Sequence, residues 1–289
     1  MAVQTRTIKR RIKSVKNTRK ITKAMELVAA SKMRKAISSV IGSRPYSKLA
    51  WETVASLTRT IDTSVHPLLK RNPDVKHVLL VLITSDRGLA GGFNTNILKK
   101  TRESIKTLGE NVSIQTICIG KRGADAMRRL QIPIMASFLD ITNNTKFEEV
   151  LPIGRMIINE FKKGSFDRVL VAYTDFVSAV TQTPLILELL PLGSDQNQDV
   201  KQTQEALFEP SPALVLDQLL PRLVETMVYQ AILESSASEH SARMLAMRSA
   251  SDSAGEMLQD LTFTFNQARQ AGITQEIAEI SSGKAALEG

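Results

Sequence analysis

Cysteine is almost absent from this sequence, which has 289 residues and a single cysteine, Cys118. One cysteine excludes a disulfide within the chain and a thiol switch between two of its own cysteines. It favours a reducing, cytosolic compartment. We expect Cys118 to be a small buried hydrophobic residue in a strand, and the alternative is a nucleophilic thiol.

Long apolar runs and an apolar signal region are missing as well. No stretch of about 18 apolar residues occurs, so we expect no membrane-spanning helix. The N-terminus is basic from its start and lacks an apolar signal region, so we do not expect secretion. A mitochondrial import segment is not evident either. Aromatic residues make up only 4% of the chain, although 43% of it is hydrophobic. This balance excludes a disordered chain and indicates long helices packed through small side chains.

Proline and glycine are scarce at both ends of the chain, which predicts two long helices. No proline follows Pro221, and apolar residues recur at helical spacing across residues 211–289. Residues 4–60 have the same character, and Gly42 and Pro45 are the positions where that helix could bend. Neither helix fits inside one small domain, so we expect the two to pair antiparallel. Small residues at intervals of three or four would let them approach closely: Ala231, Ser235, Ser238, Ala242 and Ala246.

The middle of the chain alternates between strand and helix patterns. We expect five strands, of which the last two could form a hairpin: Val75–Thr84, Val112–Ile119, Ile132–Phe138, Asp167–Thr174 and Pro184–Leu190. We expect three helices: Thr95–Leu108, Arg122–Leu130 and Phe147–Lys163. The predicted fold is a long antiparallel coiled coil of N- and C-terminal helices with an inserted Rossmann-like open α/β domain, which has helices on both faces. The predicted domain bounds are 1–61, 75–193 and 211–289.

Charge is divided unequally between the two ends. Residues 1–62 hold 15 Lys/Arg and 3 Asp/Glu, a net charge of +12, whereas residues 213–289 hold 5 and 10, a net charge of −5. Opposite signs suit two helices that lie side by side, and the surplus positive charge suits an acidic partner. The basic run from Arg6 to Lys23 leaves four interpretations open: a solvated helix face, nucleic-acid binding, binding to an anionic membrane, and an acidic protein partner.

The segment Ser85–Asn94 has the most enzyme-like pattern, because a glycine-rich turn between a strand and a helix can wrap a phosphate. It lacks the lysine and Ser/Thr of a P-loop and the spacing of a dinucleotide fingerprint. The alternative is a structural turn in which glycines supply positive φ and Asn94 or Thr95 caps the helix. The phosphate-binding interpretation predicts an enzyme with a phosphate site, whereas the structural turn predicts a protein without an active site of its own.

Other chemistry finds little support. The three histidines, His66, His77 and His240, are isolated in the sequence, so we expect no metal site. A Ser/His/Asp site stays open, although no nucleophile elbow is present. Polar residues beside apolar ones near the C-terminus, around Arg269–Glu279, fit either a solvated face or a surface that contacts several environments in turn.

Four segments together resemble the ATP synthase γ subunit family. They are Ile12–Met33, Ser85–Asn94, Glu234–Met247 and Ala268–Ile277. The resemblance covers the whole chain in order, and a chance match to all four segments is not credible. Members often have cysteine at the position of Ala90. The single cysteine and the lack of a long insertion after Phe176 resemble the bacterial type, without the chloroplast-type regulatory segment.

This resemblance implies a non-catalytic rotor shaft. The two terminal helices would turn inside a ring of alternating α and β subunits, which carry the nucleotide sites. The α/β domain would sit against the ε subunit and the membrane c ring, with one copy of the chain per complex. Proton flow would turn the c ring, and the shaft would drive each β subunit through open, loose and tight states. The chain would lie at the cytoplasmic face of the bacterial plasma membrane and would need no cofactor and no nucleic acid.

The resemblance also implies roles for particular residues. Lys23 and Met25 would lie near an acidic lever loop of the β subunits. Loops of the β subunits would bond four residues of the upper shaft: Arg269, Gln270, Thr274 and Glu276. Glu209 would lie near the polar loops of the c ring.

Overall fold

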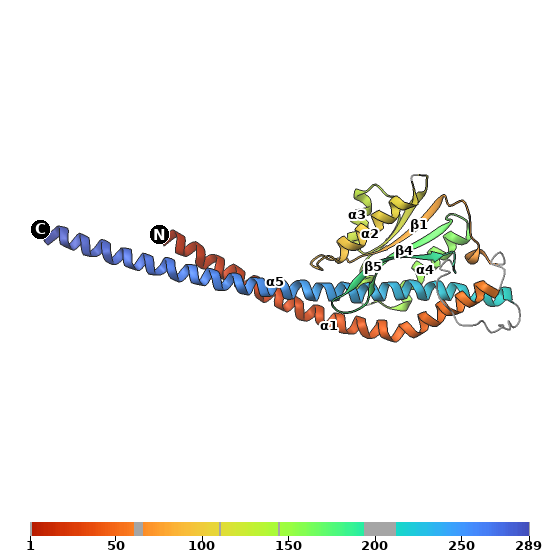
Figure 1. Cartoon of the computed structure of the whole chain (residues 1–289), viewed down its shortest axis with the longest axis horizontal. Helices are drawn as coiled ribbons and strands as arrows, with labels where there is room; N and C mark the ends of the chain where they lie inside the picture. Colours follow the sequence, from red (N-terminus) through yellow and green to blue (C-terminus); the bar gives the residue numbers. More distant parts are fainter. Residues whose placement is uncertain (1, 61–65, 110, 144, 194–211, 289) are drawn as a thin grey trace. The chain divides into compact units, whose positions relative to one another are not determined.

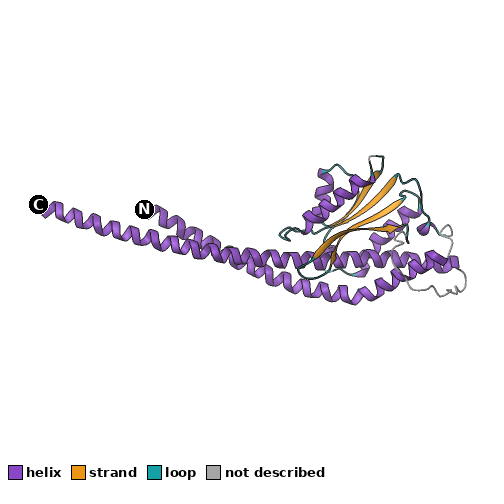
Figure 2. Ribbon diagram, in the orientation of Figure 1, coloured by secondary structure: helices purple, strands orange, loops and turns teal. Residues whose placement is uncertain are grey.

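The computed structural model describes residues 2–60, 66–109, 111–143, 145–193 and 212–288 (Figures 1 and 2). Two long helices, α1 (Ala2–Thr60) and α5 (Pro212–Glu288), enclose the α/β segment in the sequence. Pro45 lies inside α1 and Pro221 inside α5, so neither proline ends its helix. Over the described ranges, none of the helices combines the length and apolar character needed to cross a lipid bilayer.

The chain divides into two compact units, and each long helix contributes to both. The first unit, here called the coil unit, comprises residues 1–28 and 244–289. The second, here called the sheet unit, comprises residues 29–243. In the coil unit α1 and α5 run antiparallel, because Arg19 lies against Gly255 while Lys9 and Phe265 line the same groove. The predicted antiparallel pairing of two long helices is confirmed.

The sheet unit contains one five-stranded sheet in the order β3–β2–β1–β4–β5. Its strands are β1 (His77–Ile83), β2 (Ser113–Ile119), β3 (Ile134–Phe138), β4 (Arg168–Phe176) and β5 (Gln182–Leu190). The first four run parallel, and β5 returns antiparallel to β4, which confirms the predicted hairpin. Its helices are α2 (Phe93–Leu108), α3 (Lys121–Arg129) and α4 (Phe147–Lys162), with short 3₁₀ turns η2 (Pro67–Leu69) and η3 (Ile141–Asn143).

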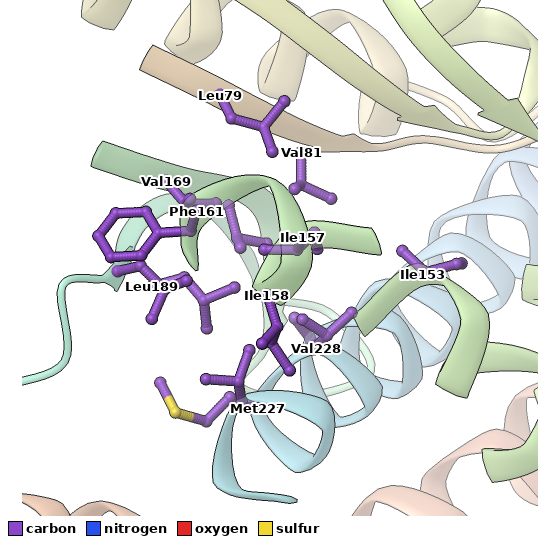
Figure 3. Packing of buried hydrophobic residues seen from close by; sticks show 14 of the residues in the cluster. Leu79, Val81, Ile153, Ile157, Ile158, Phe161, Val169, Leu189, Met227 and Val228 are labelled. Carbon is purple, nitrogen blue, oxygen red and sulfur yellow. The ribbon is translucent and has the colours of Figure 1, made fainter. Parts of the chain in front are cut away.

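Both faces of the sheet are covered, and alternate residues of β1 show why. Val78, Leu80 and Leu82 point to the face covered by α2 and α3, where Ile97 and Met127 complete the core. Leu79, Val81 and Ile83 point to the opposite face, which is covered by α4 and by the first turns of α5 (Figure 3). A continuous apolar strand therefore serves two cores, as parallel strands buried on both faces do.

The start of α5 belongs to the core of the sheet unit, which the sequence analysis did not predict. Met227 and Val228 pack with Ile157 and Ile158 of α4 in the same cluster (Figure 3). A helix that is buried on the sheet and also pairs with α1 needs apolar or small residues on most of its surface. This explains why residues 223–241 are almost continuously buried.

Two of the small residues of α5 that were predicted to face α1 form hydrogen bonds with β4 instead. Ser235 Oγ accepts a hydrogen bond from the Thr174 amide at 3.0 Å, and Ser238 Oγ donates to the Thr174 carbonyl at 3.2 Å. Ala231 lies in the core shared with α4 and the sheet. The two serines therefore face β4, whereas Ala231 also lines a cavity with Arg44 and Pro45 of α1. In the apolar part of the contact with α1, Leu233 and Ala237 pack against Ala36 and Val40.

Candidate functional site

The predicted contact residues of the upper shaft lie on exposed turns of α5 in the coil unit. Arg269, Gln270, Thr274 and Glu276 are all exposed. Arg269 and Glu276 line an open groove of about 560 Å³, together with Arg6 and Lys9 of α1. Charges of both signs are therefore available to groups outside the chain. Hydrogen bonds and ion pairs from these side chains can be broken and formed again with a different partner more readily than a large apolar interface can.

Lys23 and Met25 lie on α1 in the coil unit. The Lys23 ammonium forms an ion pair with Glu26 Oε2 at 2.9 Å, and 57% of the lysine side chain is exposed. Because most of the lysine side chain is exposed, although only 13% of the Glu26 side chain is, water screens the pair, and Lys23 can exchange Glu26 for another partner. Met25 is half-buried, while Ile21, Leu27 and Val28 are exposed. The apolar stretch Ile21–Val28 is thus only partly used in packing within the unit.

Apolar exposure continues along α5. Phe263 is 72% exposed and Ile280 is 73% exposed. Exposed large apolar residues that recur along a helix are typical of an interaction surface, whereas single ones need no explanation. Glu209, the predicted c-ring contact, lies outside the described residues.

The segment Ser85–Asn94 is built as a turn. Asn94 Oδ1 accepts from the Ser85 amide at 3.1 Å, and Asn94 Nδ2 donates to Ser85 Oγ at 2.8 Å. The predicted capping role of Asn94 or Thr95 was wrong: α2 begins at Phe93, and Gly92 precedes it without a side-chain cap. Asn94 instead closes the turn. The amide of Phe93 bonds the Ala90 carbonyl, so part of the backbone that a phosphate would need is already paired.

The carboxylate of Asp86 ties this turn to two neighbouring loops. It accepts from the Lys121 amide at 3.0 Å and from the Asp140 amide at 2.9 Å. These amides follow β2 and β3, so one side chain joins the carboxyl ends of three adjacent strands. Gly120 has φ +93°, and a Cβ there would lie 2.1 Å from the Thr84 carbonyl oxygen, so only glycine fits this edge.

An arginine of α5 fastens the same turn to the long helix. Arg243 Nη2 lies 3.4 Å from the Arg87 carbonyl and 3.3 Å from the Gly88 carbonyl. Its Nη1 atom pairs with Glu239 Oε1 at 2.7 Å, and the two side chains are 12% and 4% exposed. Burial raises the pKa of Glu239, and the Arg243 charge opposes that rise. We call Glu239, Arg243 and the turn Ser85–Asn94 the anchor.

A second polar cluster, centred on the buried Glu234, joins α1, α5 and β4. Arg44 of α1 donates to the Phe176 carbonyl at 2.7 Å, and its Nε atom lies 3.4 Å from Glu234 Oε1. Gln230 Nε2 donates to the same Glu234 oxygen at 2.8 Å. The carboxylate of Asp175 lies 3.7 Å from Arg44 Nη2 and also neighbours the carboxyl group of Glu234. Burial, reinforced by the neighbouring Asp175, raises the pKa of Glu234 to about 7.

Glu234 is expected to make the stability of the chain depend on pH between about 4.5 and 7. Because its folded pKa lies above the ordinary value, the folded state holds the proton more tightly. The stabilisation of the folded state by protonated Glu234 is complete below pH 4.5 and is lost as the pH rises through 7. Denaturant unfolding should show a free energy of unfolding that falls by up to about 1.4 kcal/mol per pH unit in this window, relative to Glu234→Gln. Parallel pH profiles for the two proteins would contradict this assignment.

Sequence analysis missed both buried clusters, although one signal was available. Glu239 and Arg243 stand four residues apart, a spacing that brings side chains together on a helix. The acidic residues Glu234 and Glu239 interrupt a run of small and apolar residues, where a charge needs a partner. The sequence did not show which residues of other elements contact Glu234 and Arg243.

The remaining candidates have structural roles. Cys118 is fully buried, as predicted, and burial raises its pKa. His66 is buried and its Nε2 atom lies 3.0 Å from Asp217 Oδ1. Within the ranges that the structure describes, no three His, Cys, Asp or Glu residues come together as a metal site would require.

Comparison with known proteins places the chain in a family. The family model described as ATP synthase matches residues 4–287. A protein of Dehalococcoides mccartyi named ATP synthase gamma chain is 44% identical over 284 residues, which are 98% of each protein. A protein of the same name from Heliobacterium modesticaldum is 42% identical over 289 residues, with the same shares covered.

Solved structures agree with this result. A chain of the central stalk and c ring of the Tetrahymena thermophila mitochondrial ATP synthase matches with a TM-score of 0.63 and 28% identity, covering 80% of this chain and 99% of that one. A chain of the Euglena gracilis mitochondrial ATP synthase shares the fold, with a TM-score of 0.71 and 22% identity over 99% of this chain and 95% of that one. The full-length matches to bacterial relatives settle the assignment: the chain belongs to the ATP synthase gamma chain family.

Proposed function

We propose that this chain is the central rotor shaft of an F-type ATP synthase, which couples proton-driven rotation of the c ring to ATP synthesis and hydrolysis on a ring of α and β subunits. The main support for this proposal is the structure of the coil unit. It consists of two paired helices and leaves large apolar residues such as Phe263 and Ile280 exposed. Two paired helices cannot bury these exposed apolar residues between themselves, and other subunits that surround the helices would cover them. The gamma chain relatives and the central-stalk likeness support the same role.

The chain does mechanical work in this proposal and no chemistry. The nucleotide sites lie on the surrounding subunits, mainly β, and one shaft serves each complex. The sheet unit meets the ε subunit and the c ring, and the complex holds the chain peripherally at the cytoplasmic face of the bacterial plasma membrane. The division into residues 1–61, 75–193 and 211–289 is part of the proposal, as terminal shaft segments and an inserted domain.

The family resemblance suggests the residue roles, and the exposure of the coil unit is compatible with them. Lys23 can give up its weak pair with Glu26 for an acidic lever loop of a β subunit. Met25, half-buried beside it, provides an uncharged surface over which that loop can pass. Arg269, Gln270, Thr274 and Glu276 offer donors and acceptors to successive β subunits.

Assembly tests the proposal. The full chain, expressed with its α and β subunits, is expected to co-purify with them and with ε, and ATP hydrolysis should appear only in the assembled complex. The chain alone should hydrolyse no ATP. A purified chain that hydrolyses ATP, with the activity lost in Gly91→Val, would instead favour a phosphate site in Ser85–Asn94.

A further inference from the structure

An open cavity of about 610 Å³ lies in the sheet unit, with walls from α1, β4, β5 and α5. Pockets that bind small organic molecules usually have volumes of about 300–1,000 Å³. Four residues give the cavity apolar walls: Pro45, Leu187, Met227 and Ala231. Water gains few hydrogen bonds against such walls, and its release stabilises an apolar group that takes its place. The walls therefore favour an occupant with an apolar body.

The charged groups in and beside the described lining are paired within the protein. Arg44 lies 3.4 Å from Glu234 Oε1 and 3.7 Å from Asp175 Oδ1. The Lys48 ammonium lies 3.9 Å from Glu52 Oε1. Burial, with the neighbouring Asp175, raises the pKa of Glu234 to about 7, so near pH 7 Glu234 is partly protonated and the two carboxyl groups still carry negative charge. An anion would meet that negative charge, and a cation would meet Arg44 and Lys48. The lining therefore favours an uncharged occupant.

A hydroxyl group of the described lining is without a partner. Tyr173 of β4 lines the cavity and is half-buried, and its hydroxyl forms no hydrogen bond with any described residue. The hydroxyl is not one of the fully buried polar atoms that lack a partner, so it keeps accessible surface. Burial, with the nearby charges of Glu234 and Asp175, raises the pKa of Tyr173, so the phenol keeps its proton at neutral pH. A protonated phenol can donate a hydrogen bond to an acceptor on a ligand.

We propose that this cavity binds an uncharged, largely apolar molecule through a carbonyl oxygen that accepts a hydrogen bond from the Tyr173 hydroxyl. The apolar body of the molecule would lie against Pro45, Leu187 and Met227. Because the walls come from α1 on one side and from β4, β5 and α5 on the other, the bound molecule would hold α1 to the sheet. None of the residues proposed to contact other subunits lines the cavity, so this inference stands independently of the proposed function.

A brominated methyl naphthyl ketone provides a direct test, because bromine scatters X-rays anomalously. Crystals of the full chain soaked in this ketone should show a bromine peak in the cavity, with the ketone oxygen within hydrogen-bond distance of the Tyr173 hydroxyl. A cavity that holds only water or another part of the protein, with the bromine peak absent or elsewhere, would overturn the proposal.

Prodan, an uncharged naphthalene ketone whose emission reports the polarity around it, measures the affinity in solution. The full chain is expected to bind Prodan saturably, and unbrominated methyl naphthyl ketone should displace it. Naphthoate has the same ring system with a charged carboxylate in place of the ketone, and its affinity should be at least about 10-fold lower. Naphthoate that displaces Prodan as well as the ketone does would contradict the preference for an uncharged ligand and overturn the proposal.

Tyr173→Phe removes the hydroxyl and keeps the ring, so it should weaken Prodan binding about 5–10-fold while circular dichroism shows an unchanged fold. Tyr46→Phe removes the hydroxyl of an exposed tyrosine outside the described lining and is the matched control. Phe263→Ser removes an exposed apolar residue of the coil unit, and it should also leave the affinity unchanged. An affinity that is unchanged in Tyr173→Phe, or that falls in Phe263→Ser, would place the probe on exposed apolar surface and contradict the site.

Discussion

Arg243→Leu is expected to lower the free energy of unfolding by about 3–5 kcal/mol, because it removes one partner of a buried ion pair. Glu239 would keep a carboxylate that is 4% exposed and has lost its cation, and two carbonyls of the turn Ser85–Asn94 would lose a donor. The variant would destabilise the sheet unit, because the anchor joins the turn Ser85–Asn94 to α5 in that unit. Denaturant unfolding of the full chain, followed by circular dichroism, measures it.

Two further variants separate the ion pair from simple packing. Arg243→Lys keeps the positive charge but not the planar fork that reaches the turn and Glu239 together, so it should lose less stability. The double variant Glu239→Leu with Arg243→Leu removes both charges and should recover much of the stability lost in the single variant. A loss below about 1 kcal/mol in Arg243→Leu, the value of an exposed pair, would contradict the anchor.

Met25→Lys is expected to slow ATP synthesis and ATP-driven proton pumping by about 10–100-fold if the proposed lever loop of the β subunits passes this position, because a new ion pair with that acidic loop would hold the rotor at one angle. A charge-assisted bond is worth about 1.5–3 kcal/mol, and each 1.4 kcal/mol added to a barrier is a tenfold change in rate. Met25 is half-buried on α1, in the stretch whose neighbours Leu27 and Val28 are exposed. Both rates can be measured in membrane vesicles that contain the assembled complex.

Met25→Leu is the matched control, since it keeps an apolar side chain of similar volume and should leave coupling close to that of the unmodified chain. Assembly of both variants must be checked by co-purification, which separates a coupling defect from a missing shaft. High ionic strength should weaken the effect of the new lysine if the lever loop stays partly hydrated. Coupling in Met25→Lys that equals coupling in Met25→Leu would remove the proposed role of this position.

The architecture could be predicted from the sequence because its signals are local. The apolar run of β1 and the pattern after Asp167 each specify a strand without reference to the rest of the fold, and α2 and α4 follow from helical spacing. The absence of proline after Pro221 specified the length of α5 in the same way. Element bounds mostly differed by two residues or fewer, as frayed ends do.

The sites were harder to predict because they depend on contacts across the fold. Helical spacing shows that Ser235 and Ser238 share a face of α5, but it does not show whether that face meets α1 or β4. Asn94 has the side chain of a helix cap, and only its distance to Ser85 shows that it closes a turn instead. The anchor needed the position of Arg243 relative to the Gly88 carbonyl, which no periodicity contains. Residues for contacts with other subunits came from family resemblance, since this chain alone cannot reveal its partners.

The proposal that this chain is a rotating shaft can be tested by observing its rotation inside the assembled complex. Lys99→Cys places a reactive thiol on the exposed side of α2, and the buried Cys118, whose pKa is raised by burial, will not compete for the label. With the surrounding subunits fixed to a surface and a bead attached at this thiol, addition of ATP should turn the bead continuously in one direction, in steps equal in number to the catalytic subunits. A bead that only fluctuates about one angle, on complexes that still hydrolyse ATP, would contradict the central claim that this chain is the rotating shaft.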